Sequence, residues 1–255
     1  MHLLAIDTST EHCSVAVRRD HDGEVFARQV LAGQKHSLLL LPMIDEVLRE
    51  SGLRLAQIGG IAYGEGPGSF TGLRIACSVV QGIAAAHGAQ VLGVSTLASV
   101  AEQARTLHLV RGGIEQHGHQ QDDCYWVVAL DARMGEVYCA PLQWQAAQQW
   151  RLLEPVRVCA PTAVPALPVF SDSAAMPSWH GCGSGFAVHG VALQQAWGSA
   201  LAGVLSSDSS PLVPEAGSIL RLAMPALLAG QGLPAEQALP VYIRDRVALR
   251  SGERR

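Results

Sequence analysis

The fold of this chain is decided near its start, by the stretch Leu3-Leu4-Ala5-Ile6-Asp7-Thr8-Ser9-Thr10. An apolar run that ends at an aspartate and a hydroxyl-rich turn predicts a buried strand followed by a tight connection. Alternating residues at 13–18, and a further segment at 23–30 after an Asp-Gly turn signal, predict two more strands in antiparallel order. The chain therefore opens as a strand, a hairpin and a third strand.

The same pattern returns in the second half of the chain. Val127-Val128-Ala129-Leu130-Asp131 repeats the first apolar run about 124 residues later, and a polar turn and an alternating strand at 136–140 follow it. Residues 106–124, between the two copies, are polar and glycine-rich and show no hydrophobic period. We expect an α/β protein with an N-terminal half at residues 1–105, a boundary loop at 106–125 and a C-terminal half at 126–255. Each half is expected to be a mixed sheet with flanking helices, and a last strand is expected at residues 239–243.

Composition excludes several classes of protein. The 255 residues are 49% apolar, which is enough for a hydrophobic core, and the net charge of −4 lacks the basic field of an autonomous nucleic-acid binder. The five arginines at positions 244, 246, 250, 254 and 255 are expected to lie in a solvated tail. No uncharged apolar run reaches about 18 residues, and Asp7 interrupts the first one, so neither a membrane span nor a secretory signal is expected. The six cysteines lack metal-site spacing, which favours a reducing compartment and a cytoplasmic location.

Two helices predicted in the first half have more apolar surface than one sheet needs. The helix at residues 36–51 has two neighbouring apolar stripes, one formed by Leu38, Leu41, Ile44 and Leu48 and the other by Leu40, Met43 and Val47. The helix at residues 71–87 has a row of small side chains, Ser78, Gly82 and Ala86, which would let another helix approach closely. These helices are either buried between the sheet and a neighbouring element or form a surface for a partner.

The aspartates at the ends of the two repeated strands are candidate site residues. The backbone N–H groups and hydroxyls of Thr8 and Ser9 are suited to a phosphate, and the carboxylates of Asp7 and Asp131 are suited to a metal-bound water. Two hairpins whose aspartates only cap turns explain the same pattern. The glycine-rich stretch at residues 64–72 opens a helix, but it lacks the Gly-Lys-Ser/Thr of a phosphate-binding P-loop, so a tight strand-to-helix turn is the simpler interpretation.

The stretch Gly64-Glu65-Gly66-Pro67-Gly68-Ser69-Phe70-Thr71-Gly72-Leu73-Arg74 is the most specific motif of the chain. It closely resembles the signature of the TsaB (YeaZ) family, bacterial subunits of the tRNA threonylcarbamoyladenosine machinery. Agreement extends to residues 5–10, 41–45, 93–97, 131–138 and 240–244, and the strong matches lie within residues 3–140.

The resemblance implies an actin-like fold and a scaffold role without catalysis or a cofactor. Members of this family pair with a catalytic paralogue, TsaD, which transfers a threonylcarbamoyl group to N6 of adenosine 37 in tRNAs that read codons starting with A. The ATPase TsaE joins this complex, tRNA is contacted through it, and a homodimer is expected where the partner is absent. Pairing uses the first two helices, here residues 36–51 and 71–87. The expected contact residues are Leu38, Leu41, Met43, Val47, Arg74, Ser78, Gln81, Gly82 and Ala86, and Asp7, Thr8, Ser9 and Asp131 are expected to be a vestigial nucleotide site.

Two enzymatic alternatives remain. One is an ATP-dependent phosphotransferase or ATPase that uses Asp7 and Asp131 around Mg²⁺. The other is a metallopeptidase, a label that relatives have carried, but TsaD has a metal-binding H-x-x-x-H pair where this chain has Thr96 and Val100, which cannot replace imidazole. No catalytic residue and no metal ligand are therefore assigned. The loop with His117, His119 and residues 122–124 is interpreted as a polar insertion, with zinc or nickel binding as the alternative.

Overall fold

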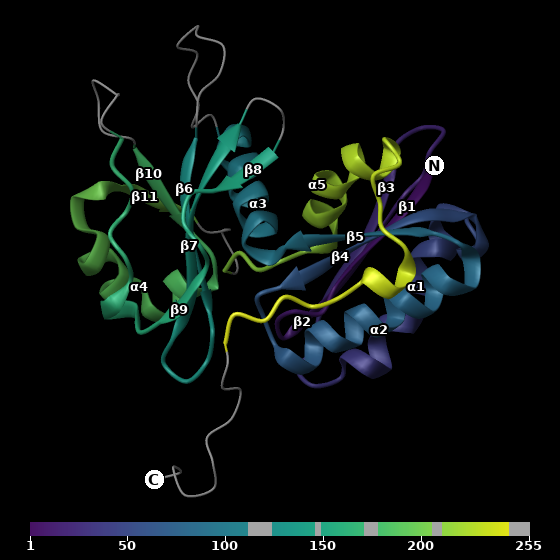
Figure 1. The fold of residues 1–255 in the computed structure, drawn as a ribbon, viewed down its shortest axis with the longest axis horizontal. Coiled ribbons are helices and arrows are strands. Elements are labelled where there is room, and N and C mark those ends of the chain that lie inside the picture. The colour runs from purple at the N-terminus through teal and green to yellow at the C-terminus, as the bar shows by residue number, and fades with distance from the viewer. Residues whose placement is uncertain (112–123, 146–148, 171–177, 206–210, 245–255) are drawn as a thin grey trace, which may run out of the picture.

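Two mixed β-sheets stand side by side in the protein, one from each half of the chain (Figure 1). The computed structural model describes residues 1–111, 124–145, 149–170, 178–205 and 211–244. The metal-binding alternative at His117 and His119, and the basic tail beyond Arg244, lie outside these residues. Within the part described, no helix is both long and apolar enough to cross a bilayer.

The two sheets have the same topology. The first runs in the order β3-β2-β1-β4-β5 and the second in the order β8-β7-β6-β10-β11, and in each the first three strands are antiparallel and the last two join in parallel. The strands are β1 (His2–Asp7), β2 (His12–Arg18), β3 (Val25–Leu31), β4 (Ile58–Gly66), β5 (Gln90–Ser95), β6 (Tyr125–Asp131), β7 (Val137–Gln145), β8 (Gln149–Leu152), β10 (Trp179–Cys182) and β11 (Leu201–Leu205), with β9 (Arg157–Cys159) also pairing with β7. The repeat predicted from the sequence and the actin-like fold class are confirmed.

The first apolar run is buried on both faces of its sheet. Leu4 and Ile6 pack with side chains of α1 (His36–Ser51) and α2 (Phe70–His87), whereas Leu3 and Ala5 pack with α5 (Ala216–Leu228) on the opposite face. Because alternate side chains of a strand point to opposite faces, a strand covered on both sides is a continuous apolar run.

The two halves exchange helices. The helix α3 (Thr96–Val110) follows the last strand of the first sheet, but Leu97 and Val100 pack with Trp126 and Leu142 of the second sheet. In the opposite direction, α5 comes from the second half and buries Ile219 against the first sheet. Each half therefore contributes one helix to the hydrophobic core of the other.

Several elements differ from the sequence prediction. The helix α3 runs to Val110 and so extends into the predicted boundary loop at 106–125. Residues 239–243 do not form the predicted strand. They belong to an extended segment, residues 231–244, that we call the strap. The other helices within the described ranges are α4 (Ser184–Trp197) and four short 3₁₀ helices at Leu55–Gln57, Pro161–Ala163, Gly198–Ala200 and Ala235–Gln237.

The strap connects the two halves along the surface. Leu233 exchanges two backbone hydrogen bonds of 2.8 Å with Val91 at the edge of the first sheet. The segment then passes over α2 and reaches the second half, where Arg244 pairs with Glu136. In Figure 1 it is the yellow trace that runs past α2 toward the other sheet.

Truncation of Leu97 tests the helix exchange. Leu97→Ala should lower the free energy of unfolding by about 2–5 kcal/mol, because this side chain is fully buried and its removal leaves a cavity. Leu38→Ala is the matched control: Leu38 is 71% exposed, so the same truncation should change the free energy of unfolding by less than about 0.5 kcal/mol. Urea unfolding followed by circular dichroism measures both. Equal effects at the two positions would contradict the observed packing of α3.

Candidate functional site

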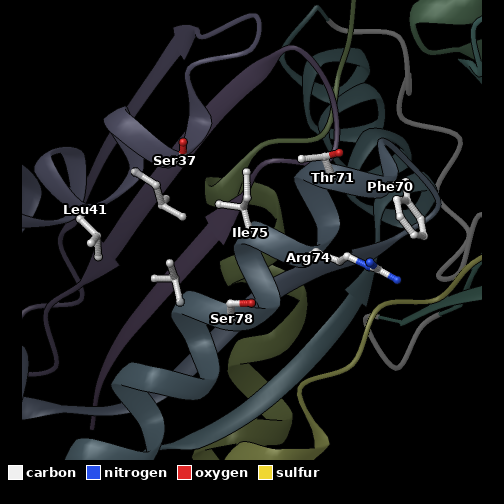
Figure 2. Close-up of a pocket in the computed structure, with 9 residues that line it drawn as sticks. Ser37, Leu41, Phe70, Thr71, Arg74, Ile75 and Ser78 are labelled. Atoms are coloured by element: carbon white, nitrogen blue, oxygen red, sulfur yellow. The ribbon is translucent and has the colours of Figure 1, made fainter.

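The outer surface of α1 and α2 is hollowed by a groove of about 420 Å³ (Figure 2). The described residues that line it are mostly apolar and supply three hydroxyl groups and a single charged group, the guanidinium of Arg74. The lining residues are Ser37, Leu40 and Leu41 from α1 and Phe70, Thr71, Arg74, Ile75, Ser78 and Val79 from α2. An apolar groove between two surface helices has the form in which a third helix packs.

Large apolar side chains are exposed beside this groove. Leu38 is 71% exposed and Leu41 is 55% exposed, although most of the apolar side chains of α1 face the core. The predicted row of small residues, Ser78, Gly82 and Ala86, lies at the surface of α2. Together these residues form an outward surface that nothing in the described part of the chain covers.

Two of the predicted contact residues are in the wrong place for a partner. Met43 is 5% exposed and Val47 is fully buried, and both pack in the core beneath α1. The inner stripe of this helix consists of Leu40, Met43, Ile44, Val47 and Leu48. A charge at Val47 would therefore disrupt the fold rather than a docking surface. Gln81 is half-buried, and its side chain donates a 3.0 Å hydrogen bond to the carbonyl of Ala238 in the strap.

The Asp7 turn uses its own polar groups internally. Asp7 is fully buried, and its Oδ1 accepts hydrogen bonds from the backbone N–H (3.0 Å) and the hydroxyl (2.8 Å) of Ser9. The Thr8 hydroxyl donates to the carbonyl of Gly72 at 2.7 Å, and the N–H of Ser69 donates to the carbonyl of Ser9 at 2.7 Å. The loop that opens α2 thus packs directly on the turn, and the hydroxyls of Thr8 and Ser9 are already engaged within the protein.

This close approach accounts for the glycine-rich motif. A Cβ atom on Gly64 would overlap Oδ2 of Asp7, and one on Gly72 would overlap the carbonyl oxygen of Thr8. A Cβ on Gly68 would lie 2.5 Å from the carbonyl oxygen of Ser9. Gly68 and Gly72 are needed because backbone packs on backbone, as the interpretation of a tight strand-to-helix turn predicts, and Gly64 leaves room for the carboxyl of Asp7.

The second half repeats the arrangement around Asp131. A Cβ on Gly183 or Gly185 would collide with the carbonyl oxygen of Ala129, so the glycine cluster at the start of α4 packs on β6 as the first cluster packs on β1. Asp131 is held by its own hairpin: its Oδ1 accepts a 3.1 Å hydrogen bond from the N–H of Arg133, and the guanidinium of Arg133 lies 3.6 Å from its Oδ2. The same guanidinium lies 2.8 Å from Glu11, so an ion pair joins the two hairpins.

Thr96 and Val100, the positions compared above with a metal-binding pair, have structural roles in this protein. The Thr96 hydroxyl donates a 2.6 Å hydrogen bond to the carbonyl of Pro67, and both Thr96 and Val100 are fully buried. No group of three or more His, Cys, Asp or Glu side chains suited to a metal ion occurs among the described residues.

Tyr242 is a neighbour of the groove that the sequence pattern did not predict. Its hydroxyl accepts a 2.8 Å hydrogen bond from Nε of Arg74, and its ring lies 5.0 Å from that of Phe70. The motif at residues 240–244 marked this segment, but its alternation predicted a strand, so no contact with α2 could be foreseen.

The chain is similar to proteins of one family over almost its whole length. It is 35% identical over 251 residues to the tRNA threonylcarbamoyladenosine biosynthesis protein TsaB of Escherichia coli, a match that covers 97% of this chain and 96% of that protein. The protein of the same name from Haemophilus influenzae is 35% identical over 252 residues, or 96% and 94% of the two chains. The solved structure of YeaZ from Pseudomonas aeruginosa is 37% identical, has a TM-score of 0.74 and covers 94% of this chain and 99% of that chain.

A related family matches part of the chain. Residues 30–149 match the model of the TsaD family, described as tRNA N6-adenosine threonylcarbamoyltransferase. This range contains α1, α2 and α3 and therefore the whole groove.

Two glycines of one helix test the backbone packing. Gly72→Ala should lower the free energy of unfolding by about 1–3 kcal/mol or more, because its Cβ would force the Thr8 backbone away. Gly82→Ala is the matched control: a Cβ at this position would meet no atom within 4 Å, so alanine should raise the free energy of unfolding by up to about 1 kcal/mol. Thermal and urea unfolding measure both. Similar effects of the two substitutions would contradict the close approach at Gly72.

The buried carboxyl of Asp7 predicts a pH dependence of stability. Burial raises the pKa of Asp7 to about 6, its hydrogen bonds from Ser9 oppose the rise, and Oδ2 has no hydrogen-bond partner. The folded state therefore holds a proton that the unfolded state releases, so this group lowers the free energy of unfolding as pH rises from about 4 to 6. For the wild type, this contribution to the free energy of unfolding falls by roughly 2–3 kcal/mol across that range, and Asp7→Asn should abolish the fall.

Urea unfolding at several pH values checks this expectation. Asp45→Asn, which removes an exposed carboxyl instead of a buried one, is the control and should change the curve much less than Asp7→Asn does. A wild-type curve that rises between pH 4 and 6 relative to that of Asp7→Asn would show that the carboxyl is not the destabilising group.

Proposed function

This chain belongs to the TsaB family of tRNA threonylcarbamoyladenosine biosynthesis proteins, and we propose that it is the non-catalytic subunit that binds and activates TsaD. TsaD transfers the threonylcarbamoyl group to N6 of adenosine 37 in tRNAs that read codons starting with A. The proposal includes TsaE and tRNA as partners within the complex, a cytoplasmic location, and self-association when TsaD is absent.

The observation that carries the proposal is the exposed apolar surface of α1 and α2. Leu38 and Leu41 project beside an open groove, and the neighbouring face of α2 has small side chains at Ser78, Gly82 and Ala86. Small residues allow two helices to approach closely, and exposed leucines favour burial against an apolar partner. The match of residues 30–149 to the TsaD family supports a partner with a similar pair of helices.

The absence of a role in catalysis is supported by how the candidate catalytic positions are used. Thr96 and Val100 are buried, and the hydroxyl of Thr96 is engaged by Pro67. The turn at Asp7 is closed by the loop that precedes α2, and Asp131 is held by Arg133. Oδ1 of Asp7 and the carboxylate of Asp131 are thus engaged by neighbouring groups of the protein itself, which favours the scaffold over the ATPase alternative.

A charge at the centre of the exposed surface tests the proposal. Leu41→Asp should abolish a stable complex with TsaD from the same source, weakening binding by at least about thirtyfold, because the carboxylate would be buried without a partner. Size-exclusion chromatography with light scattering measures the complex. The chain alone, the wild-type mixture and the mixture with the variant are compared.

Val191→Asp is the matched control for this experiment. Val191 is 72% exposed on α4, away from the groove, so its substitution should leave the complex intact. A wild-type mixture without a heteromeric peak, with and without ATP and TsaE, would remove the main support for the scaffold function. A complex that survives Leu41→Asp would place the interface elsewhere.

A further inference from the structure

Arg74 is the one charged residue among the described residues that line the groove, and two aromatic rings hold it in place. Its guanidinium carbon lies 3.8 Å from the centre of the Phe70 ring and 5.8 Å from that of Tyr242. Its Nε donates a 2.8 Å hydrogen bond to the Tyr242 hydroxyl. Figure 2 shows Phe70 and Arg74 pointing to the same side of α2, away from Leu41. Stacking and one hydrogen bond therefore fix the direction of the guanidinium before any partner binds.

The terminal nitrogens of the Arg74 guanidinium are available to donate hydrogen bonds to a partner. Within the part of the chain that the structure describes, no ion pair joins Arg74 to a carboxylate, and its hydrogen bond to Tyr242 uses Nε and leaves the two terminal nitrogens without a partner there. The two terminal nitrogens of an arginine form a planar fork that matches the two oxygens of a carboxylate. A helix that filled the groove would cover this cation, and a covered charge must be paired.

We propose that Arg74, oriented by Tyr242 of the strap, pairs with a carboxylate side chain on the helix of TsaD that occupies the groove. This inference rests on the proposed function and specifies the chemistry of the partner: apolar side chains over Leu41 and Ile75, and an Asp or Glu at the Phe70 end. Tyr242 is a positioning residue, because it acts through Arg74.

The strap is anchored well enough to serve this purpose. The N–H of Val241 donates a 2.7 Å hydrogen bond to the carbonyl of Glu65, and the Tyr63 hydroxyl donates a 3.2 Å hydrogen bond to the carbonyl of Leu239. On the other side of Tyr242, Arg244 pairs with Glu136 of the second half. The position of the Tyr242 hydroxyl is thus fixed by contacts with both halves.

Four variants test the pairing by calorimetric titration of the full-length chain with TsaD at low and high salt. Arg74→Gln should weaken binding by about tenfold or more and reduce the dependence of affinity on salt. Arg74→Lys should restore part of the affinity and part of its dependence on salt. Tyr242→Phe, which keeps the ring and removes the hydroxyl, should weaken binding severalfold, but should have no further effect when combined with Arg74→Gln, because the two residues act together.

Each remaining outcome overturns the inference in a distinct way. Wild-type affinity for Arg74→Gln, together with loss of binding for Leu41→Asp, would reject the ion pair and leave the scaffold function standing. Additive effects of Tyr242→Phe and Arg74→Gln would reject the positioning role. An effect of Arg74→Gln seen only with ATP would assign the cation to a phosphate, and an effect only on the self-association of the chain would assign it to a second copy. No binding by the wild-type chain would reject both proposals.

Discussion

The contact between the Asp7 turn and the glycine-lined loop before α2 determines where the rest of the first half can lie. The Thr8 hydroxyl and the Ser9 carbonyl bind the backbone of this loop, so the start of α2 is fixed against the end of β1. Ser69 caps the helix from the same loop. The helix α2 is one wall of the groove and places Arg74 beside the strap. A substitution at the turn that shifts α2 would therefore also change the shape of the groove.

The sequence predicted the elements that depend on local pattern. Repeated apolar runs, the hairpin turns and the two helices of the first half were found because their periodicity is set by the faces they bury. The inward stripe of α1 was not separable from the outward one, since residues 38–41 are four consecutive leucines; Met43 and Val47 were therefore assigned to the wrong face. Two features could not be predicted: the exchange of α3 and α5, and the role of Tyr242. Both depend on contacts between residues far apart in the chain, which produce no hydrophobic periodicity in the sequence.

The duplication also shows what is particular to the first half. Both halves use a glycine cluster to seat a helix on the hairpin, at Gly72 and at Gly183. Between β8 and β10, however, the described residues contain β9 and a short 3₁₀ helix in place of a counterpart to α1. A groove between two long helices therefore occurs in only one of the two halves, within the part of the chain that the structure describes. The asymmetry is consistent with one docking surface for each chain.

The exchange of helices has a consequence for how such a chain could be divided. A break after Arg111 would leave the first fragment with α3 but without the helix that covers one face of its sheet, and the second fragment with α5 but without its own cover. Neither fragment would be complete alone, yet each would carry the missing piece of the other. Two such fragments would therefore be expected to bind each other, as in fragment complementation. For the same reason, neither half would be expected to fold as an independent domain.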